Sequence, residues 1–534
     1  MSDQDQGQYL HTQSAAPRQP SLWPRNPSAP PDPGSPNRRR IASIACVVLV
    51  AIVAISQQIS AHSTSDTPAD AKPGTSIASI YSKIMVKVFG ALGPSMSQTE
   101  RDQLRNNVSP ALQEMAMTAD ERIGVVVAQG ELGDAELALT EIDRFTDWLI
   151  LNADLAAKNP LGQDKQHPKV DLPTGLNMID YYAAGPQRAE YELDAESLRA
   201  IYKGTATAEQ TSRLATRHGF FGKLAPTHAD KKGKEHQALV ASGFGLVMVM
   251  GLAGLVFLGA FLAGFVCFII ALVQILSRKI QPRMDIPDPG GSVYLELVAL
   301  FVGGFFAVKI LVTVVGYFAM KDLPQGAEAP AWLTTFSMAI QWVLVLVPFY
   351  PLVVGVPASR WKSDLGLHAP RGIFREIAFG VFAYFAGLPV LFLGAVTSLI
   401  LKLISDQINK TVGAPPSNPV IEEVMNANVG TLLLFFCLAT FWAPFVEEAV
   451  FRGALFRHLR SWLILPIAAI GSALVFGLMH GYEIIMLGPV IALGFTFAMM
   501  RHYRGSLVSA ITAHALHNGT IMTLLISIIT LAKG

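Results

Sequence analysis

The sequence has few charged residues and few cysteines. Only 15% of its 534 residues are Asp, Glu, Lys or Arg, whereas an ordinary soluble domain carries roughly 25%, so a wholly soluble enzyme is excluded. The 41 Lys and Arg residues almost balance the 40 Asp and Glu residues, which gives no support to a nucleic-acid binder. The three cysteines, Cys46, Cys267 and Cys437, each lie in an apolar run. An odd number at such positions argues against a disulfide framework or a thiolate metal cage.

Long apolar runs are what the chain has in excess. Residues 243–276 contain no charged residue, and about 20 apolar residues are enough to cross a bilayer. Eight such runs lie at 241–276, 293–320, 331–357, 374–401, 430–452, 463–480, 484–500 and 506–531. A ninth, at 41–57, follows Arg38, Arg39 and Arg40. The sequence therefore predicts an all-α fold, a polytopic membrane helix bundle with about eight core spans and one N-terminal span.

The first 240 residues differ from the rest in composition. Residues 1–37 are rich in Pro, Ser and Gln. This composition predicts that residues 1–40 form a disordered cytoplasmic tail. We interpret 41–57 as an uncleaved signal anchor, since about 40 residues of leader is long for a cleaved signal peptide, which is the alternative. In residues 58–240, apolar residues recur at three- and four-residue spacing, which predicts a soluble helical domain.

Basic residues are concentrated in alternate loops. With a cytoplasmic N-terminus, the loops on that side carry Arg278, Lys279, Arg283, Arg360, Lys362, Arg371, Arg375, Arg457, Arg460, Arg501 and Arg504. The opposite short loops carry Lys321, Lys402 and Lys410. Because cytoplasmic loops hold such an excess, we expect a multi-pass protein with its N-terminus in the cytoplasm and residues 58–240 on the extracytoplasmic side.

Ionisable residues inside apolar spans are candidates for function, because a charge in hydrocarbon is costly. On a helix Glu448 and Arg452 share a face and can neutralise each other. Glu447 points about 100° away and is left without that partner. An unpaired carboxylate in a low-dielectric site is suited to act as a general base. The alternative is a pair of acids in a cytoplasmic surface turn.

Two further clusters carry histidines. Phe476 and His480 share one helix face, and His514 and Asn518 share another. Hydrogen bonds between helices are the alternative interpretation of either cluster alone. At 1.5 Å per residue, Glu447, His480 and His514 lie about 20, 28 and 14 Å from the cytoplasmic side, differences that helix tilt can absorb. We therefore expect a carboxylate, two imidazoles and an amide to meet within the bilayer.

The three clusters resemble a known family. EEAVFRG (Glu447–Gly453), FGLMH (Phe476–His480) and HALHN (His514–Asn518) look like the ordered motifs of the CPBP intramembrane proteases, also called ABI. That family includes CAAX prenyl proteases of the Ras-converting-enzyme type and bacteriocin-processing or immunity proteins. The resemblance divides the membrane core into N-terminal spans (241–429) and a protease motif region (430–531). All key positions are filled, which implies an active member.

The resemblance also implies a role for each residue. Glu447 would activate water, and His480 would hydrogen-bond the same water. His514 and Asn518 would donate hydrogen bonds to the oxyanion, where charge develops. Structural support would come from Glu448, Arg452 and Phe476.

Zinc is an open alternative, because the family has also been called a metalloprotease family. Glu447, His480 and His514 could supply three ligands, with water as the fourth. The sequence has no His-Glu-x-x-His helix, and spacing alone does not decide between the two mechanisms. We favour catalysis that requires no cofactor.

The predicted function is that of an intramembrane endopeptidase that hydrolyses a peptide bond of a membrane-associated protein or peptide. Its expected partners are that substrate and the lipid bilayer, without nucleic acid. One alternative is a non-catalytic scaffold or immunity-type protein, against which the filled motif positions argue. The other is a proton-coupled transporter, since intramembrane acids and histidines can relay protons. The sequence shows no inverted repeat in its support.

Overall fold

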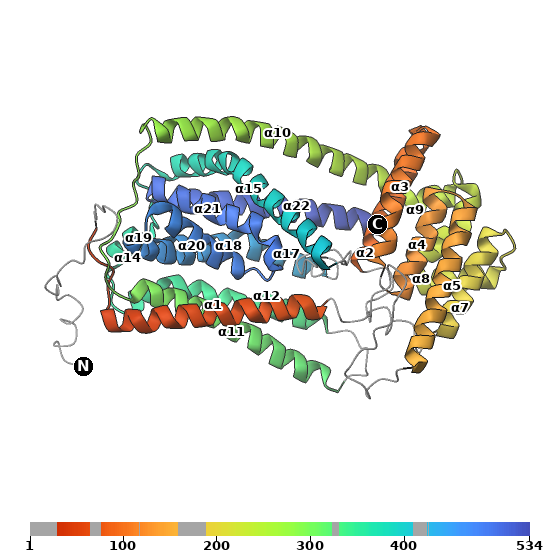
Figure 1. Ribbon diagram of the computed structural model, residues 1–534, viewed down its shortest axis with the longest axis horizontal. Coiled ribbons are helices and arrows are strands. Elements are labelled where there is room, and N and C mark those ends of the chain that lie inside the picture. The colour runs from red at the N-terminus through yellow and green to blue at the C-terminus, as the bar shows by residue number, and fades with distance from the viewer. Residues whose placement is uncertain are drawn as a thin grey trace.

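The chain folds into helices arranged in two regions. The computed structural model describes residues 29–64, 76–116, 118–158, 188–322, 330–409, 424 and 427–533. In this part of the chain every element is helical apart from an isolated bridge between Ala29 and Pro287, which confirms the all-α fold class. Figure 1 shows a bundle of long helices with a smaller group of helices at one end.

The bundle is built mainly from long apolar helices. Its first part contains α1 (Pro36–Thr64), α10 (Gly243–Leu276), α11 (Val293–Met320), α12 (Ala331–Gln341), the 3₁₀ segment η4 (Trp342–Phe349), α13 (Tyr350–Val353), α14 (Ala358–Leu365) and α15 (Ile373–Asn409). Its second part contains a segmented helix over 429–462, then α20 (Leu465–Leu478), η7 (Ile484–Met486), α21 (Gly488–Arg504) and α22 (Val508–Lys533). Helix α15 packs against α10, α21 and α22. Gly394 and Gly488 let α15 and α21 meet backbone to backbone, because a Cβ on either would collide with the other's carbonyl.

Seven helices in the described residues are long and apolar enough to cross a membrane. They are Pro36–Gln58, Lys234–Leu276, Val293–Met320, Trp332–Val353, Ile373–Ser405, Val429–Trp462 and Val508–Lys533. The other two of the nine expected spans are shorter helices, α20 with 14 residues and α21 with 17. At 1.5 Å per residue these two are about 21 and 26 Å long. The molecule is an integral, multi-pass membrane protein.

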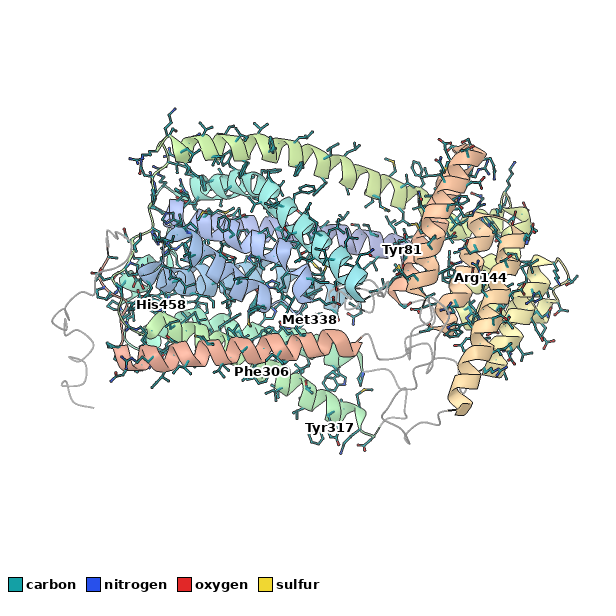
Figure 2. The ribbon with its side chains drawn as sticks, viewed as in Figure 1. Tyr81, Arg144, Phe306, Tyr317, Met338 and His458 are labelled. Carbon is teal, nitrogen blue, oxygen red and sulfur yellow. The ribbon has the colours of Figure 1, made fainter. Side chains whose placement is uncertain are left out.

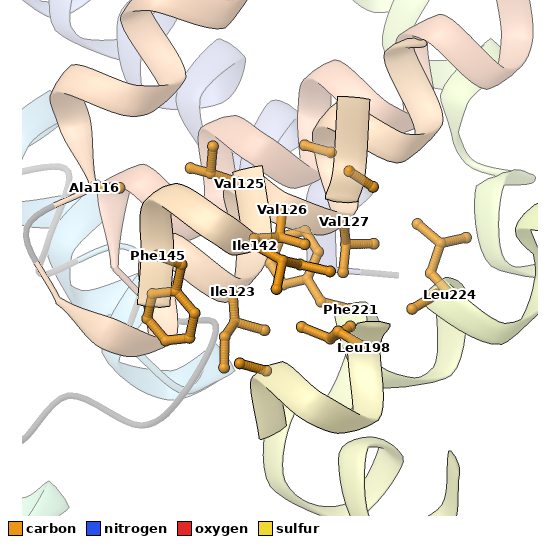
Figure 3. Packing of buried hydrophobic residues seen from close by; sticks show 14 of the residues in the cluster. Ala116, Ile123, Val125, Val126, Val127, Ile142, Phe145, Leu198, Phe221 and Leu224 are labelled. Carbon is orange, nitrogen blue, oxygen red and sulfur yellow. The ribbon is translucent and has the colours of Figure 1, made fainter. Parts of the chain in front are cut away.

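The smaller region has its own hydrophobic core. Its elements are α2 (Ile77–Leu92), η2 (Gly93–Ser95), α3 (Gln98–Met115), α4 (Ala119–Leu132), α5 (Ala135–Lys158), α7 (Arg188–Tyr202), α8 (Ala208–Leu224), η3 (Ala225–Asp230) and α9 (Lys234–Val240). Capping boxes begin α3 and α4, where Ser97 and Thr118 exchange hydrogen bonds with Glu100 and Glu121. Apolar side chains of α4 form the centre of the core, with Phe221 of α8 beside them (Figure 3).

A buried ionic cluster ties three helices of this region together. His218 Nε2 lies 2.9 Å from Asp194 Oδ2, and His218 Nδ1 lies 3.0 Å from Asp120 Oδ1. Arg213 and Arg217 also pair with Asp194. Burial acts to lower the pKa of His218, but the hydrogen bonds and charges of the two carboxylates outweigh it and raise that pKa.

Helix α2 joins the two regions. It packs against α4 on one side and against α10 and α22 on the other. The buried Lys87 ammonium donates hydrogen bonds to Ala532 O at 3.1 Å and Leu531 O at 3.4 Å. These carbonyls end α22, where a positive charge is favoured by the helix dipole.

The N-terminal segment departs from the expected disordered tail. Residues 1–28 lie outside the described residues, but α1 begins at Pro36 and residues 29–35 pack on the bundle. Asp32 is buried, with its Oδ1 3.0 Å from Arg457 Nε. This partner lies some 425 positions away in the sequence, so local composition gave no sign of it.

The basic loops gather at the end of the bundle farther from the α2–α9 region. Figure 2 shows His458 at that end and Arg144 in the α2–α9 region at the other. Arg457 pairs with Asp32 and Asp364, and Arg504 pairs with Glu376. The charge asymmetry is thus a property of the two ends of the folded molecule, and its orientation in the membrane stays a prediction.

Candidate active site

The helix that carries the first motif is built from five segments with two wide turns. α17 (Val429–Cys437), the π-helix η5 (Leu438–Trp442), α18 (Ala443–Glu447), the π-helix η6 (Glu448–Leu455) and α19 (Phe456–Trp462) follow one another without a loop. Pro444 stands at the start of α18. A proline has no N–H and its ring clashes with the carbonyl four residues earlier, so the preceding turn widens. Glu447 and Glu448 lie at the junction between α18 and the second π-helix.

Glu448 is the centre of a fully buried network. Its Oε1 accepts a hydrogen bond from Arg452 Nη1 at 3.0 Å, the ion pair that the four-residue spacing suggests. The same oxygen lies 2.9 Å from His514 Nδ1. Because a carboxylate only accepts, the His514 proton that faces it is on Nδ1. Glu448 therefore both neutralises Arg452 and sets the orientation of the His514 ring.

Two aromatic rings enclose this network. The Arg452 guanidinium lies 4.1 Å from the centre of the Phe476 ring and 5.2 Å from that of Phe497. The His514 ring stacks on Phe497 at 5.1 Å and meets Phe476 edge to face at 6.0 Å. A desolvated cation over an aromatic face is stabilised by about 2 kcal/mol, so these rings help to hold the arginine in the membrane.

Glu447 is more open and less well paired than Glu448. Its side chain is 18% exposed, and His514 Nε2 lies 3.9 Å from Glu447 Oε2. That distance is too long for a hydrogen bond. Oε2 is also buried and has no hydrogen-bond partner in the described part of the chain. Glu447 thus has a carboxylate oxygen that the protein leaves unused, next to an imidazole nitrogen.

His480 comes to the same place from the turn that follows α20, two residues beyond its last residue, Leu478. Its ring packs edge to face on Phe476, with the ring centres 4.6 Å apart, so Phe476 contacts both His480 and His514. His480 Nδ1 lies 2.8 Å from Phe476 O. A carbonyl oxygen can only accept, so Nδ1 carries the proton and Nε2 of the neutral ring keeps its lone pair.

Asn518 lies one helical turn beyond His514 on α22. Its Nδ2 donates a hydrogen bond to Ala439 O in the π-helix η5 at 2.8 Å. One amide N–H is therefore used to hold α22 against the motif helix. The second N–H of the same group has no bond assigned to it and is a possible donor to a ligand.

The zinc alternative requires Glu447, His480 and His514 to surround one ion. Glu447, His480 and His514 are chemically suitable ligands, and hydrogen-bonded Nδ1 atoms are common behind metal-binding Nε2 atoms. Within the described residues, however, no three His, Cys, Asp or Glu side chains are grouped so that they could hold a metal ion. The three side chains do not fit a zinc ion as they lie, and the chemistry below is derived from the chain's own groups.

Sequence reasoning missed Phe497 and the buried Ser472. Phe497 stacks on His514 from α21, and Ser472 Oγ donates to Phe451 O at 2.9 Å across α20 and η6. Neither residue is charged or titratable, so neither stands out from the sequence as an ionisable group in an apolar span does. The one available signal was position, since Ser472 lies four residues before Phe476 on α20.

Comparisons with known proteins bear on the same segment. Residues 429–520 match the family model described as "Type II CAAX prenyl endopeptidase Rce1-like", while comparisons with curated proteins and with solved structures gave no match. The matched segment contains Glu447, His480, His514 and Asn518. It supports a CAAX-type intramembrane protease in general terms. The resemblance seen in the three motifs is thus confirmed, since residues 429–520 of this chain are similar to the Rce1-like CAAX protease family.

Proposed function

We propose that the protein is an intramembrane endopeptidase in which Glu447 activates water against a peptide bond of a membrane-associated protein or peptide. The observation that carries the proposal is the contrast between two neighbouring acids. Glu448 is fully buried and its Oε1 is bonded to Arg452 and His514, with its Oε2 unused, whereas the partly exposed Glu447 makes no side-chain hydrogen bond within the described residues. A structural pair of acids would give both carboxylates partners, so the unpaired one is suited to chemistry.

In the first step, the Glu447 carboxylate takes one proton from a water molecule as the water oxygen adds to the scissile carbonyl carbon. His480 accepts a hydrogen bond from the second proton of that water through Nε2, because its Nδ1 proton is held by Phe476 O. The two groups together fix the direction of the water's attack, and such positioning is a large part of enzymatic rate enhancement.

The addition leaves negative charge on the former carbonyl oxygen. Asn518 donates its second amide N–H to this oxyanion, and His514 donates from Nε2 when its ring carries both protons. The Glu448 carboxylate, which lies next to Nδ1, stabilises the positive charge of that ring. Each donor of this kind contributes on the order of 10²–10³ in rate.

In the last step the carbon–nitrogen bond breaks. The proton that Glu447 took from water passes to the departing amine, which leaves a new carboxyl terminus and a new amino terminus. Glu447 returns to its carboxylate form, so no cofactor is consumed, and none is required in the proposal.

We place the N-terminus in the cytoplasm and the α2–α9 region outside it, on the basis of the basic-residue bias. A prenyl group on the substrate is not part of the proposal.

The test is cleavage by purified full-length protein in detergent. Membrane-anchored peptides of varied sequence are incubated with the wild type, with Glu447→Gln and with Glu483→Gln, and the products are identified by mass spectrometry. Glu483 lies three residues after His480 and serves as the matched control for loss of a nearby carboxylate. We expect cleavage by the wild type and by Glu483→Gln and none by Glu447→Gln. No cleavage by the wild type, or equal cleavage by Glu447→Gln, would contradict the proposal.

A further inference from the structure

The end of the first helix makes specific contacts with the turn that carries His480. Gln57 of α1 is only 4% exposed. Its Nε2 donates to Met479 O at 3.0 Å, and its Oε1 accepts from Gly481 N at 2.9 Å. The two backbone groups belong to the residues directly before and after His480, so one amide side chain bridges the position of the histidine.

The turn needs such a bridge because helix α20 ends there. Its last residue is Leu478, and Gly481 has φ +71°, a left-handed conformation that favours glycine. Neither Met479 O nor Gly481 N therefore continues a helical hydrogen-bond ladder. In a membrane an unpaired backbone group is costly. An amide side chain offers a donor and an acceptor side by side, one for each of these two groups.

The position of α1 is fixed by contacts at both of its ends. Near its start, Asp32 pairs with Arg457 of α19, and the Arg39 guanidinium lies over the Trp462 ring at 4.9 Å. At its far end, Gln58 Nε2 donates to Tyr482 O at 2.7 Å. Helix α1 is thus attached at one end to the helix that follows the glutamates and at the other end to the histidine turn.

We propose that Gln57 is a positioning residue that holds His480 against the reacting water by bridging Met479 and Gly481. The inference rests on the proposed function and goes beyond it, because α1 lies outside the matched segment 429–520. A helix that would serve only as a membrane anchor has no need of a buried glutamine at this point, since an apolar side chain would pack there at lower cost.

The experiment uses the full-length protein in detergent with a membrane-anchored peptide that the wild type cleaves. Gln57→Leu removes both hydrogen bonds and introduces an apolar side chain of similar size. We expect kcat to fall on the order of 10- to 100-fold, as for a small displacement of a catalytic group, with KM unchanged. The matched control is Ser56→Ala, because Ser56 Oγ bonds Val53 O of its own helix and no other group in the described residues, and its kcat should equal that of the wild type.

Gln57→Glu provides a second test that does not depend on the folding of Gln57→Leu. The neutral carboxyl group can donate to Met479 O and accept from Gly481 N, as the amide does, whereas the carboxylate cannot donate. The kcat ratio of Gln57→Glu to wild type should therefore fall as the pH rises from about 5 to about 9, as the carboxyl ionises.

The outcomes separate the two proposals. Cleavage by the wild type with an unchanged kcat in Gln57→Leu, or a pH-independent ratio for Gln57→Glu, overturns the positioning role and leaves the proposed function standing. A higher KM at unchanged kcat also overturns it, because that would place Gln57 in substrate binding. Absence of wild-type cleavage overturns the proposed function and this role with it.

Discussion

Removing the Arg452 guanidinium should destabilise the protein far more than removing it together with the charge of Glu448. Both side chains are fully buried, with Arg452 Nη1 3.0 Å from Glu448 Oε1. Arg452→Met keeps most of the side-chain volume but leaves a buried carboxylate with His514 as its remaining partner. Breaking a buried ion pair on one side costs about 3–5 kcal/mol, and we expect a loss of that size in the free energy of unfolding.

The double variant Glu448→Gln with Arg452→Met should recover much of this loss. The new amide oxygen still accepts from His514 Nδ1, and no unpaired charge is left in the membrane. We expect a coupling energy of about 2–3 kcal/mol between the two sites, at the upper end for residues in direct contact. The control pair is Arg144 and Glu141, where the Arg144 side chain is 60% exposed. Its coupling should not exceed about 1 kcal/mol.

The assay is unfolding of the purified full-length protein in detergent, for the wild type, each single variant and the double variant. The same four-way comparison is made for the control pair. Additive effects at Glu448 and Arg452, with a coupling below about 0.5 kcal/mol, would refute the view that Arg452 is retained in the membrane by its pairing with Glu448.

Three further expectations concern other parts of the molecule. The pKa of His218 is raised from its ordinary 6.5, so its pairing with Asp194 stabilises the fold below that value and the stability is lost as the pH rises through the raised pKa. Thermal unfolding followed against pH should show this fall in the wild type, and an equal fall in His218→Gln would contradict it. Prolonged chelation should leave cleavage activity intact, whereas stoichiometric zinc that tracks activity would refute the metal-independent mechanism. An impermeant thiol reagent should label single cysteines placed in residues 77–92 of intact cells but not Lys362→Cys, and labelling of Lys362→Cys would reverse the topology.

Much of the fold follows from local patterns in the sequence. The long charge-free run at 243–276 could only be a membrane-crossing helix, and α10 covers those residues. The four-residue spacing of Glu448 and Arg452 likewise suggests their ion pair, which the structure contains. The lengths of helices α20 and α21 were less predictable. Apolar composition shows that a segment is buried, but it does not show whether the segment crosses the whole bilayer.

The contacts between distant segments could not be predicted in the same way. For basic residues such as Arg457 and Arg504 the sequence predicts only the side of the membrane, yet both are buried in ion pairs with Asp32 and Glu376. Their partners come from other helices, and no local spacing encodes such a pairing. The contacts of Gln57 are unpredictable for a related reason, since a neutral polar residue at the end of an apolar run is typical of an ordinary helix terminus.

The π-helical turns were also beyond local reasoning. Local patterns predict a regular helix around Glu447, in which Glu447 and Glu448 differ by about 100° in direction. Wide turns at 438–442 and 448–455 change which carbonyls are free, and Ala439 O accepts from Asn518 as a result. A single proline at 444 signals an irregular turn, but it does not say whether the helix kinks or widens.

The source of the oxygen atom in the product tests most directly whether Glu447 activates water. Purified wild-type protein, in molar excess over a membrane-anchored peptide, is allowed one turnover in ¹⁸O-labelled water, and the new carboxyl terminus is analysed by mass spectrometry beside the peptide that contains Glu447. If water attacks the scissile carbonyl directly, the first product carries one ¹⁸O atom and Glu447 carries none. An unlabelled first product, with ¹⁸O found in Glu447, would show that the carboxylate itself had bonded to the substrate and would contradict the account.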